Sequence, residues 1–455
     1  MGKGQSENED GGMRKALPCV VIGLVSVALA EPTWPPRLPS GKLVRTDTSE
    51  QFLKATAKLS PGVTVARAVP TVDFLYFDAQ TYPGNPWSVW GDGLAAGRMF
   101  YTSIGDHLAP VGNAYVYAYD SEVKSLRLVA DVRSILKRPE GWYTPGKIHS
   151  RIDLGSDGWL YFSTHRGSTR ATVIENHFEG GWVLRCHPAT GEAEVVAAAP
   201  LPNQTLPTGQ LDPDRMIFYA GTADGDREVK RVKFLSYDVK ARRTLYSDDF
   251  GPYRAIILAR STGRVYFHRE GGNGKVLPLH RFDPQKAGPP VRIGAEVGLR
   301  AATHESSKGL VFTVDGNALW VFDTRSETAR ALGELTPGSE SYIASIDLDP
   351  KTERYLYYVP GAHGGGYKDG APLAQYDLQT GKVKVVAFLH PFYQEAVGFV
   401  PMGTYATAVS PEGDKVYITW HGNRGGEERG KLRFNTCALT VVHIPESERP
   451  GVTEE

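Results

Sequence analysis

The chain has 455 residues, with 51 Lys and Arg against 51 Asp and Glu, so its formal net charge is zero. A neutral chain lacks the broad positive field of a nucleic-acid-binding protein, and we expect no nucleic-acid partner. The 50 glycines, 31 prolines and 10% aromatic residues favour many short strands joined by tight turns, which is typical of an all-β protein.

The N-terminal region has the pattern of a secretory signal. A basic pair at positions 14–15 precedes an apolar run that ends in Ala28-Leu29-Ala30. We therefore predict a signal segment over residues 1–30 and a secreted or periplasmic protein, with Met13 as an alternative start because residues 1–12 are polar. The run is short for a membrane anchor and no other stretch is apolar enough, so we expect no membrane span.

Residues 31–70 are rich in proline. They are predicted to wrap the outside of the following domain, with one short helix within residues 50–59. The sequence TVDFLYFD (residues 71–78) then reads as a strand that precedes the repeats described next.

Two short motifs recur between residues 71 and 447. A polar turn followed by an aromatic-rich strand occurs seven times: AAGRMFYTS, SDGWLYFST, DPDRMIFYA, STGRVYFHR, SSKGLVFTV, KTERYLYYV and EGDKVYITW. An aromatic residue followed by a turn-forming aspartate occurs at Asp120, Asp238, Asp283, Asp323 and Asp377. The last four aspartates are 40 to 54 residues apart, a spacing typical of propeller blades with four strands each.

The repeats therefore predict an all-β fold, a seven-bladed β-propeller of four-stranded blades over residues 71–447, with a tail over residues 448–455. The seventh blade lacks its outer strand in the sequence order. We expect residues 71–78 to supply it, because closing the ring leaves no open sheet edge.

This fold predicts a candidate site at one mouth of the central channel. The innermost strand of a blade starts beside the end of the second strand, so His149 and His165 of the second blade should lie together. The same face is predicted to hold His107, Tyr253, Arg254, His268, Arg269, Arg300, His363 and His421. A single histidine at a strand end is more often a packing or turn residue, so the pair with its arginine neighbours is the stronger candidate.

Metal and thiol chemistry have little support in the sequence. Only Cys186 and Cys437 follow the signal segment, too few for a disulfide framework or a four-thiolate zinc site. No short-spaced ligand pair occurs, so no metal ligand is assigned and no cofactor is required. Calcium or zinc held by converging rim histidines stays an open alternative.

The segment GKIHSRIDLGSDGWLYFSTHRG (residues 146–167) resembles a segment of secreted seven-bladed propeller polysaccharide lyases of the ulvan-lyase type. The repeat pattern is similar to theirs over roughly residues 71–445. The resemblance implies that His149 and His165 occupy the catalytic histidine positions and that an acidic polysaccharide is the partner. A tyrosine and an arginine complete such sites but match no motif here, so blade geometry selects Tyr253 and Arg269, with Arg254 as an alternative arginine.

The implied reaction is β-elimination from a uronic acid. A cation neutralises the carboxylate, a neutral histidine or a tyrosinate removes the C5 proton, and a tyrosine or histidine protonates the leaving oxygen. In this hypothesis Arg254, Arg300, His107, His268 and His421 bind substrate, and Trp90 and Tyr101 offer flat surfaces to sugar rings.

Two other functions remain open from the sequence. A propeller glycoside hydrolase would need paired carboxylates, and Asp106, Asp224 and Glu270 near the rim form no convincing pair. A non-catalytic secreted propeller that binds a glycan or a protein would leave the rim histidines without a chemical role.

Overall fold

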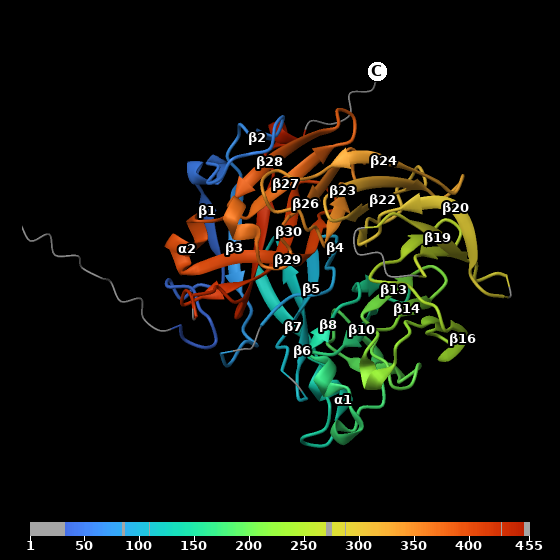
Figure 1. Cartoon of the computed structure of the whole chain (residues 1–455). Coiled ribbons are helices and arrows are strands. Elements are labelled where there is room, and N and C mark those ends of the chain that lie inside the picture. Colours follow the sequence, from blue (N-terminus) through green and yellow to red (C-terminus); the bar gives the residue numbers. More distant parts are fainter. Residues whose placement is uncertain are drawn as a thin grey trace, which may run out of the picture. The chain divides into compact units, whose positions relative to one another are not determined.

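The computed structural model describes residues 32–83, 87–108, 110–269, 275–286, 288–428 and 430–449. The signal segment expected over residues 1–30 lies outside the described residues. The described residues fall in one compact unit, and in Figure 1 its blades follow one another in chain order from cyan through green and yellow to orange.

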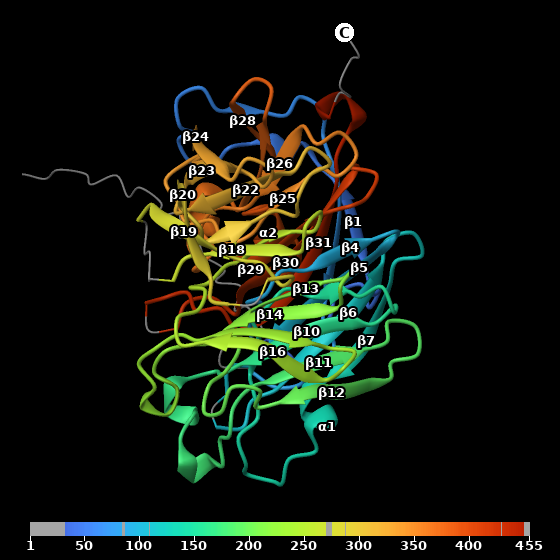
Figure 2. The ribbon, with the colours of Figure 1, turned by 90° about the vertical axis from the view of Figure 1, so that its right-hand side faces the viewer.

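The predicted seven-bladed propeller is confirmed, with four antiparallel strands in each of the first three blades. The first blade consists of β4 (Leu94–Ala96), β5 (Met99–Gly105), β6 (Ala114–Asp120) and β7 (Ser125–Asp131). In the second blade the innermost strand is divided, so the blade consists of β8 (Lys147–Ile148), β9 (Asp153–Leu154), β10 (Leu160–His165), β11 (Trp182–Cys186) and β12 (Ala193–Ala198). Figure 2 shows β10, β11 and β12 side by side. The third blade consists of β13 (Thr208–Asp212), β14 (Ile217–Gly221), β15 (Phe234–Asp238) and β16 (Arg243–Asp248).

The next three blades repeat this order. The fourth consists of β17 (Ile257–Ala259), β18 (Arg264–Phe267), β19 (Leu277–Phe282) and β20 (Val291–Val297). The fifth consists of β21 (Ala301–Ala302), β22 (Leu310–Asp315), β23 (Ala318–Asp323) and β24 (Thr328–Glu334). The sixth consists of β25 (Ile346–Leu348), β26 (Tyr355–Tyr358), β27 (Pro372–Asp377) and β28 (Lys382–Phe388).

The seventh blade is completed by a strand from the other end of the propeller sequence. It combines β29 (Phe399–Val409), β30 (Lys415–Arg424) and β31 (Thr436–His443) with β3 (Thr71–Tyr76). The register of β3 against β31 runs from Thr71 opposite His443 to Tyr76 opposite Ala438. Residues 71–76 therefore close the ring, as the missing outer strand predicted.

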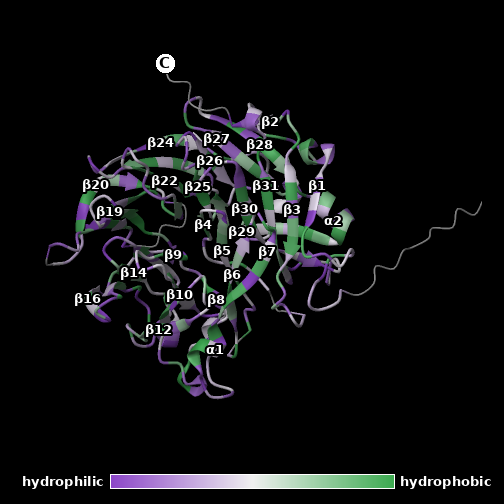
Figure 3. Ribbon diagram, turned by 180° about the vertical axis from the view of Figure 1, so that it is seen from behind, coloured by the Kyte–Doolittle hydropathy of each residue, from purple (hydrophilic) through white to green (hydrophobic). Residues whose placement is uncertain are grey.

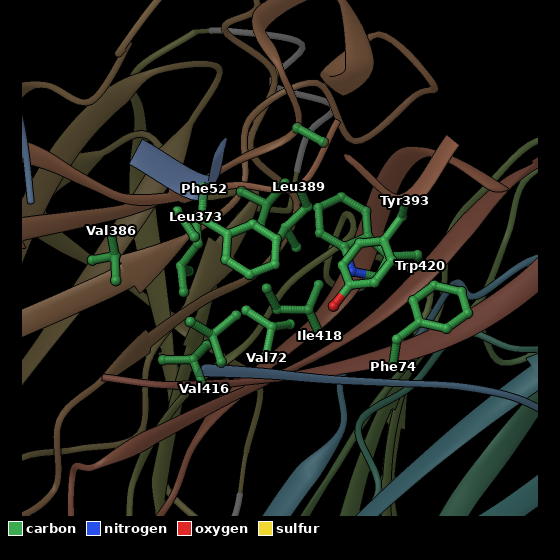
Figure 4. Packing of buried hydrophobic residues seen from close by; sticks show 14 of the residues in the cluster. Phe52, Val72, Phe74, Leu373, Val386, Leu389, Tyr393, Val416, Ile418 and Trp420 are labelled. Atoms are coloured by element: carbon green, nitrogen blue, oxygen red, sulfur yellow. The ribbon is translucent and has the colours of Figure 1, made fainter. Parts of the chain in front are cut away.

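Residues 32–70 add to the outer strands of the sixth and seventh blades. β1 (Arg45–Thr48) pairs with β3, and β2 (Thr64–Val65) pairs in parallel with β28. Between them η1 (Glu50–Leu53) brings Phe52 into the core beside α2 (Phe392–Val397). Figure 4 shows Phe52, Phe74, Tyr393 and Trp420 packed together there, all fully buried. In Figure 3 hydrophobic residues concentrate in the strands and helices, while the connecting loops are mostly hydrophilic.

The two faces of the ring carry different connections. The turns between third and fourth strands are tight, and in several blades an aspartate accepts the backbone N–H groups of the turn, as Asp120, Asp238 and Asp323 do. The opposite face carries the longer connections, which contain α1 (Val132–Leu136), η2 (Thr169–Ala171), η3 (Ile174–Asn176), η4 (Asp226–Glu228), η5 (Gly366–Asp369) and α2. The only described helix beyond the propeller strands on the C-terminal side is η6 (Glu446–Glu448). Among the described residues, no helix is long and apolar enough to span a bilayer.

Candidate functional site

A cavity of about 860 Å³ opens at the mouth of the channel, on the face with the longer connections. Each of the seven blades or the segment leading into it contributes to its wall, through Trp90, Lys147, His149, His165, Thr208, Arg254, Arg300, Tyr342, His363 and Tyr405, among others. Side chains that are hundreds of residues apart therefore face one space.

His149 and His165 meet at this mouth, as the hairpin geometry predicted. β8 pairs with β10 so that Lys147 lies opposite His165, and His149 follows directly after β8. The ring centroids of the two imidazoles are 5.6 Å apart, with the rings nearly perpendicular. His149 is half-buried, whereas His165 keeps only 7% of its surface exposed.

The hydrogen bonds of both histidines define which ring nitrogen carries the proton. His149 Nδ1 lies 3.1 Å from the carbonyl oxygen of Pro207, which can only accept, so Nδ1 donates and Nε2 keeps its lone pair. His165 Nδ1 lies 2.9 Å from Thr205 Oγ1, and that hydroxyl donates to Asp226 Oδ2 at 2.7 Å. His165 Nδ1 therefore also donates, which leaves its Nε2 as a second free acceptor.

Both imidazoles are neutral at physiological pH. Burial lowers the pKa of His149 well below its ordinary value, and the neighbouring charges of Arg300, Arg254 and Lys147 lower it further. Burial likewise lowers the pKa of His165, followed by the charges of Lys147 and its other neighbours. The cavity therefore presents two imidazole bases that carry no charge of their own.

Three cations in the cavity have no carboxylate partner. Among the described residues, no ion pair joins Lys147, Arg254 or Arg300 to an acidic side chain, although Arg300 Nε donates to Tyr342 Oη at 2.6 Å. Lys147 Nζ lies 4.1 Å from the centroid of the Trp90 ring. Arg254 has a left-handed backbone with φ of 71°, and its side chain keeps contact with solvent through the cavity.

The remaining charges of the cavity wall are one paired arginine and two carboxylates. Arg166 is neutralised by the buried Asp226, whose Oδ1 lies 2.5 Å from its guanidinium. Asp224 and Asp315 are the carboxylates of the described wall. Against them stand Arg254, Arg300 and, while it is protonated, Lys147, so an anionic ligand is favoured beside these three cations.

Arg269 does not reach this cavity, which corrects the prediction from blade geometry. Its guanidinium donates to both oxygens of Asp248, at 3.2 and 3.1 Å, and lies 4.8 Å from the Phe250 ring centroid in a separate open hollow. The preceding residue, His268, faces the cavity instead. Successive residues at the end of a strand point to opposite sides, so only one of the two could line the site.

Two of the predicted substrate-binding histidines lie behind the cavity wall. His107 stacks on Trp90 with centroids 5.0 Å apart, and His421 is fully buried with its ring 6.1 Å from Trp90. Burial lowers the pKa of His107 to about 2 and that of His421 to about 4. Neither ring lines the cavity, so their place is in the packing that supports Trp90.

The other predicted residues divide between the wall and the core. Tyr253, Arg254, His268 and Arg300 line the cavity, although His268 keeps only 2% of its surface exposed. Tyr101 belongs to a core cluster shared by the first two blades and offers no surface to a sugar. Trp90 does line the cavity, but Lys147 and His107 contact its ring.

Of the rim carboxylates considered for a glycosidase, Asp224 lines the cavity, whereas Asp106 does not. Asp106 is buried, accepts the backbone N–H groups of Leu108 and Asn113, and is bonded to the Tyr82 hydroxyl. Asp106 is therefore a structural residue, and Glu270 lies outside the described residues. No group of three or more His, Cys, Asp and Glu side chains among the described residues could hold a metal ion, and both described cysteines are buried free thiols.

The structure adds site residues that the sequence analysis did not select. Lys147 is two positions before His149, and the period-2 alternation of a strand could have indicated that both face the channel. Tyr342 and Tyr405 come from the sixth and seventh blades, and Tyr342 stacks at 4.3 Å on His363, which was expected at this face. No local motif marks Tyr342 or Tyr405.

Comparison with known proteins identifies no family for this chain. No family model matches the chain, and no curated protein matches it. Similar solved structures include the crystal structure of RRP9 WD40 repeats, with a TM-score of 0.48 and 10% identity over 86% of this chain and 100% of that chain. The β-propeller domain of the Trilobed protease from Pyrococcus furiosus has a TM-score of 0.46 and 11% identity over 82% and 99% of the two chains. A chain of the mitotic checkpoint complex has a TM-score of 0.47 and 12% identity over 88% and 98%. The resemblance to polysaccharide lyases therefore stays a hypothesis about the site.

Proposed function

We propose that the cavity binds a uronic acid unit of an acidic polysaccharide and cleaves its 4-linkage by β-elimination. The observation that carries the proposal is the pair of neutral imidazoles, whose Nε2 atoms are not used by the hydrogen bonds at Nδ1, beside three cations that have no carboxylate partner among the described residues. Elimination needs this combination, because one group must neutralise the substrate carboxylate and another must accept a proton from carbon.

Arg254 and Arg300 are the proposed carboxylate ligands. The C5 proton of a uronate is weakly acidic while the adjacent carboxylate is charged. Guanidinium groups form short charge-assisted bonds to that carboxylate and stabilise the negative charge that develops when the proton leaves. The Arg300 side chain is already held by its hydrogen bond to Tyr342. Substrate binding therefore needs little further loss of conformational entropy from this side chain.

His149 is the proposed base. It is more exposed to the cavity than His165, and its Nδ1 bond to Pro207 leaves Nε2 free to accept the C5 proton. The nearby cations that lower its pKa are the groups that a bound carboxylate would neutralise. Substrate binding therefore raises the basicity of His149 at the point where a proton must be taken.

The test is an assay for the unsaturated sugar that elimination produces. The protein is incubated with alginate, polygalacturonate, hyaluronan and ulvan, and the ultraviolet absorbance of the new C4–C5 double bond is followed. Absorbance that rises with at least one polymer supports the proposal. Polymers that bind without any rise in absorbance would instead support a non-catalytic binding module, the alternative function of the same cavity.

A further inference from the structure

We infer that Lys147 is a further catalytic residue of this cavity, the donor that protonates the leaving oxygen. The inference rests on the proposed elimination reaction. Neither the lyase resemblance nor the sequence motifs assign a lysine to the site.

The position of Lys147 places its ammonium group beside both imidazoles. It lies in β8, two residues before His149 and opposite His165 in the strand pairing. Its side chain lines the cavity, and its Nζ is held 4.1 Å from the Trp90 ring centroid. An aromatic ring holds the ammonium group in place without using all three of its N–H groups. At least one N–H group is therefore available to a ligand.

The surroundings of Lys147 favour loss of its proton. The charges that act on it are those of Arg166 and Arg254, and it acts in turn on the imidazoles of His107, His149, His165 and His363, while Asp224 and Asp315 are the carboxylates that line the same cavity. Burial first, and then the charges of Arg166 and Arg254, lower the pKa of Lys147 to about 7. A donor with a pKa near the working pH can release a proton and regain one in each cycle, which an ordinary lysine does poorly.

The proposed step is balanced in protons and electrons. The C5–H bond breaks and its proton goes to His149 Nε2, while the electron pair forms the C4–C5 double bond. The C4–O bond breaks, and the departing oxygen takes a proton from Lys147 Nζ to become a free hydroxyl. His149 then loses one proton to solvent and Lys147 regains one, so the protein returns to its starting state.

The sharpest test varies the leaving group. Lys147→Met is compared on two probes with Tyr253→Phe. The second variant removes a different proton donor, the Tyr253 hydroxyl, from the same cavity wall. One probe is the polymer that the wild type cleaves fastest, and the other is the same uronate with 4-nitrophenol at O4, which needs no protonation to depart. Lys147→Met should lose roughly 10²- to 10⁴-fold on the polymer and less than about tenfold on the nitrophenyl probe.

The outcomes separate the inference from the proposed function. Equal losses on the two probes, or the leaving-group pattern in Tyr253→Phe instead, would overturn the role of Lys147 while leaving the lyase intact. A wild type that forms no unsaturated product from any probe would overturn both.

Lys147→Arg supplies a second measurement that keeps the positive charge. The kcat/KM of the wild type should fall as the pH rises above about 7, because free Lys147 then loses its proton. An arginine stays protonated at these pH values, so the fall in kcat/KM above about pH 7 should be absent in Lys147→Arg. The variant should nevertheless react more slowly than the wild type. An unchanged basic limb would show that another group is responsible for it.

Discussion

At the scale of single residues, the hydrogen bonds at Nδ1 distinguish His149 and His165 from ordinary strand-end histidines. A backbone carbonyl holds one ring and a Thr205–Asp226 pair holds the other, so both present Nε2 to the same cavity. The two differ in burial, and this difference affects how each will respond to mutation.

His149→Ala is expected to lower turnover by roughly two to four orders of magnitude, the usual contribution of a positioned base. Its stability should change little. His165→Ala removes a buried ring together with its hydrogen bond to Thr205 Oγ1, so we expect a cost of about 1–3 kcal/mol in the free energy of unfolding as well. Denaturant titrations and product assays on both variants make the comparison. Full activity in both would contradict a catalytic role.

Arg254→Ala is expected to weaken binding of an acidic polysaccharide by about 10- to 100-fold, equivalent to one charge-assisted contact. Arg269→Ala should leave binding unchanged, because its guanidinium is paired with Asp248 outside the cavity. Calorimetric titration at two salt concentrations measures both effects. Weaker binding by Arg269→Ala alone would place the ligand in the outer hollow.

At the scale of elements, the interruption of the innermost strand of the second blade positions the site. β8 and β9 both pair with β10, and the residues between them leave the ladder. Gly91, in the segment that leads to the first blade, lies against this interruption. A Cβ at Gly91 would approach within 2.2 Å of the Ser150 carbonyl oxygen and 3.1 Å of the Ile148 carbonyl oxygen.

Gly91→Ala should therefore displace the backbone that carries His149. We expect at least a tenfold loss of turnover together with a loss of about 1–3 kcal/mol in stability, the usual cost of overpacking. Gly294→Ala is the matched control, because a Cβ there meets nothing within 4 Å. Product formation and urea midpoints that do not differ between the variants would show that the interruption tolerates movement.

At the scale of the whole molecule, ring closure brings cations from separate blades into one space. The charged form of Lys147 lowers the free energy of unfolding, because folding lowers the pKa of this residue from 10.5 to about 7. Below pH 7 both the folded and unfolded chains carry this proton, and the full cost of confining the ammonium is present. Between pH 7 and 10.5 the unfolded chain binds the extra proton, so this residue's contribution to stability improves as the pH rises.

Lys147→Met should accordingly stabilise the protein while it impairs the proposed reaction. At pH 6 we expect a gain of about 1–2 kcal/mol in the free energy of unfolding, shrinking towards pH 10. Chemical denaturation across this pH range measures the change. A gain that is constant with pH would indicate better packing of methionine against Trp90 instead of relief of a buried charge.

The sequence by itself determined the propeller and the central pair. Turn aspartates and aromatic strands recur because each blade needs the same local hydrogen bonds and the same buried faces. The missing outer strand predicted closure by residues 71–78, of which 71–76 form the strand, and the hairpin of the second blade predicted that His149 and His165 meet. The blade repeat, the ring closure and the histidine pair follow from local geometry, and short sequence motifs indicate local geometry.

Only the tertiary structure decided which other residues share the cavity. Strand-end position could not distinguish His268, which faces the cavity, from Arg269, which turns away to Asp248. Tyr342 and Tyr405 contact Arg300 because the ring closes and its blades converge on one axis. Contacts between blades depend on side-chain direction and on ring closure, and neither leaves a pattern in a short stretch of sequence.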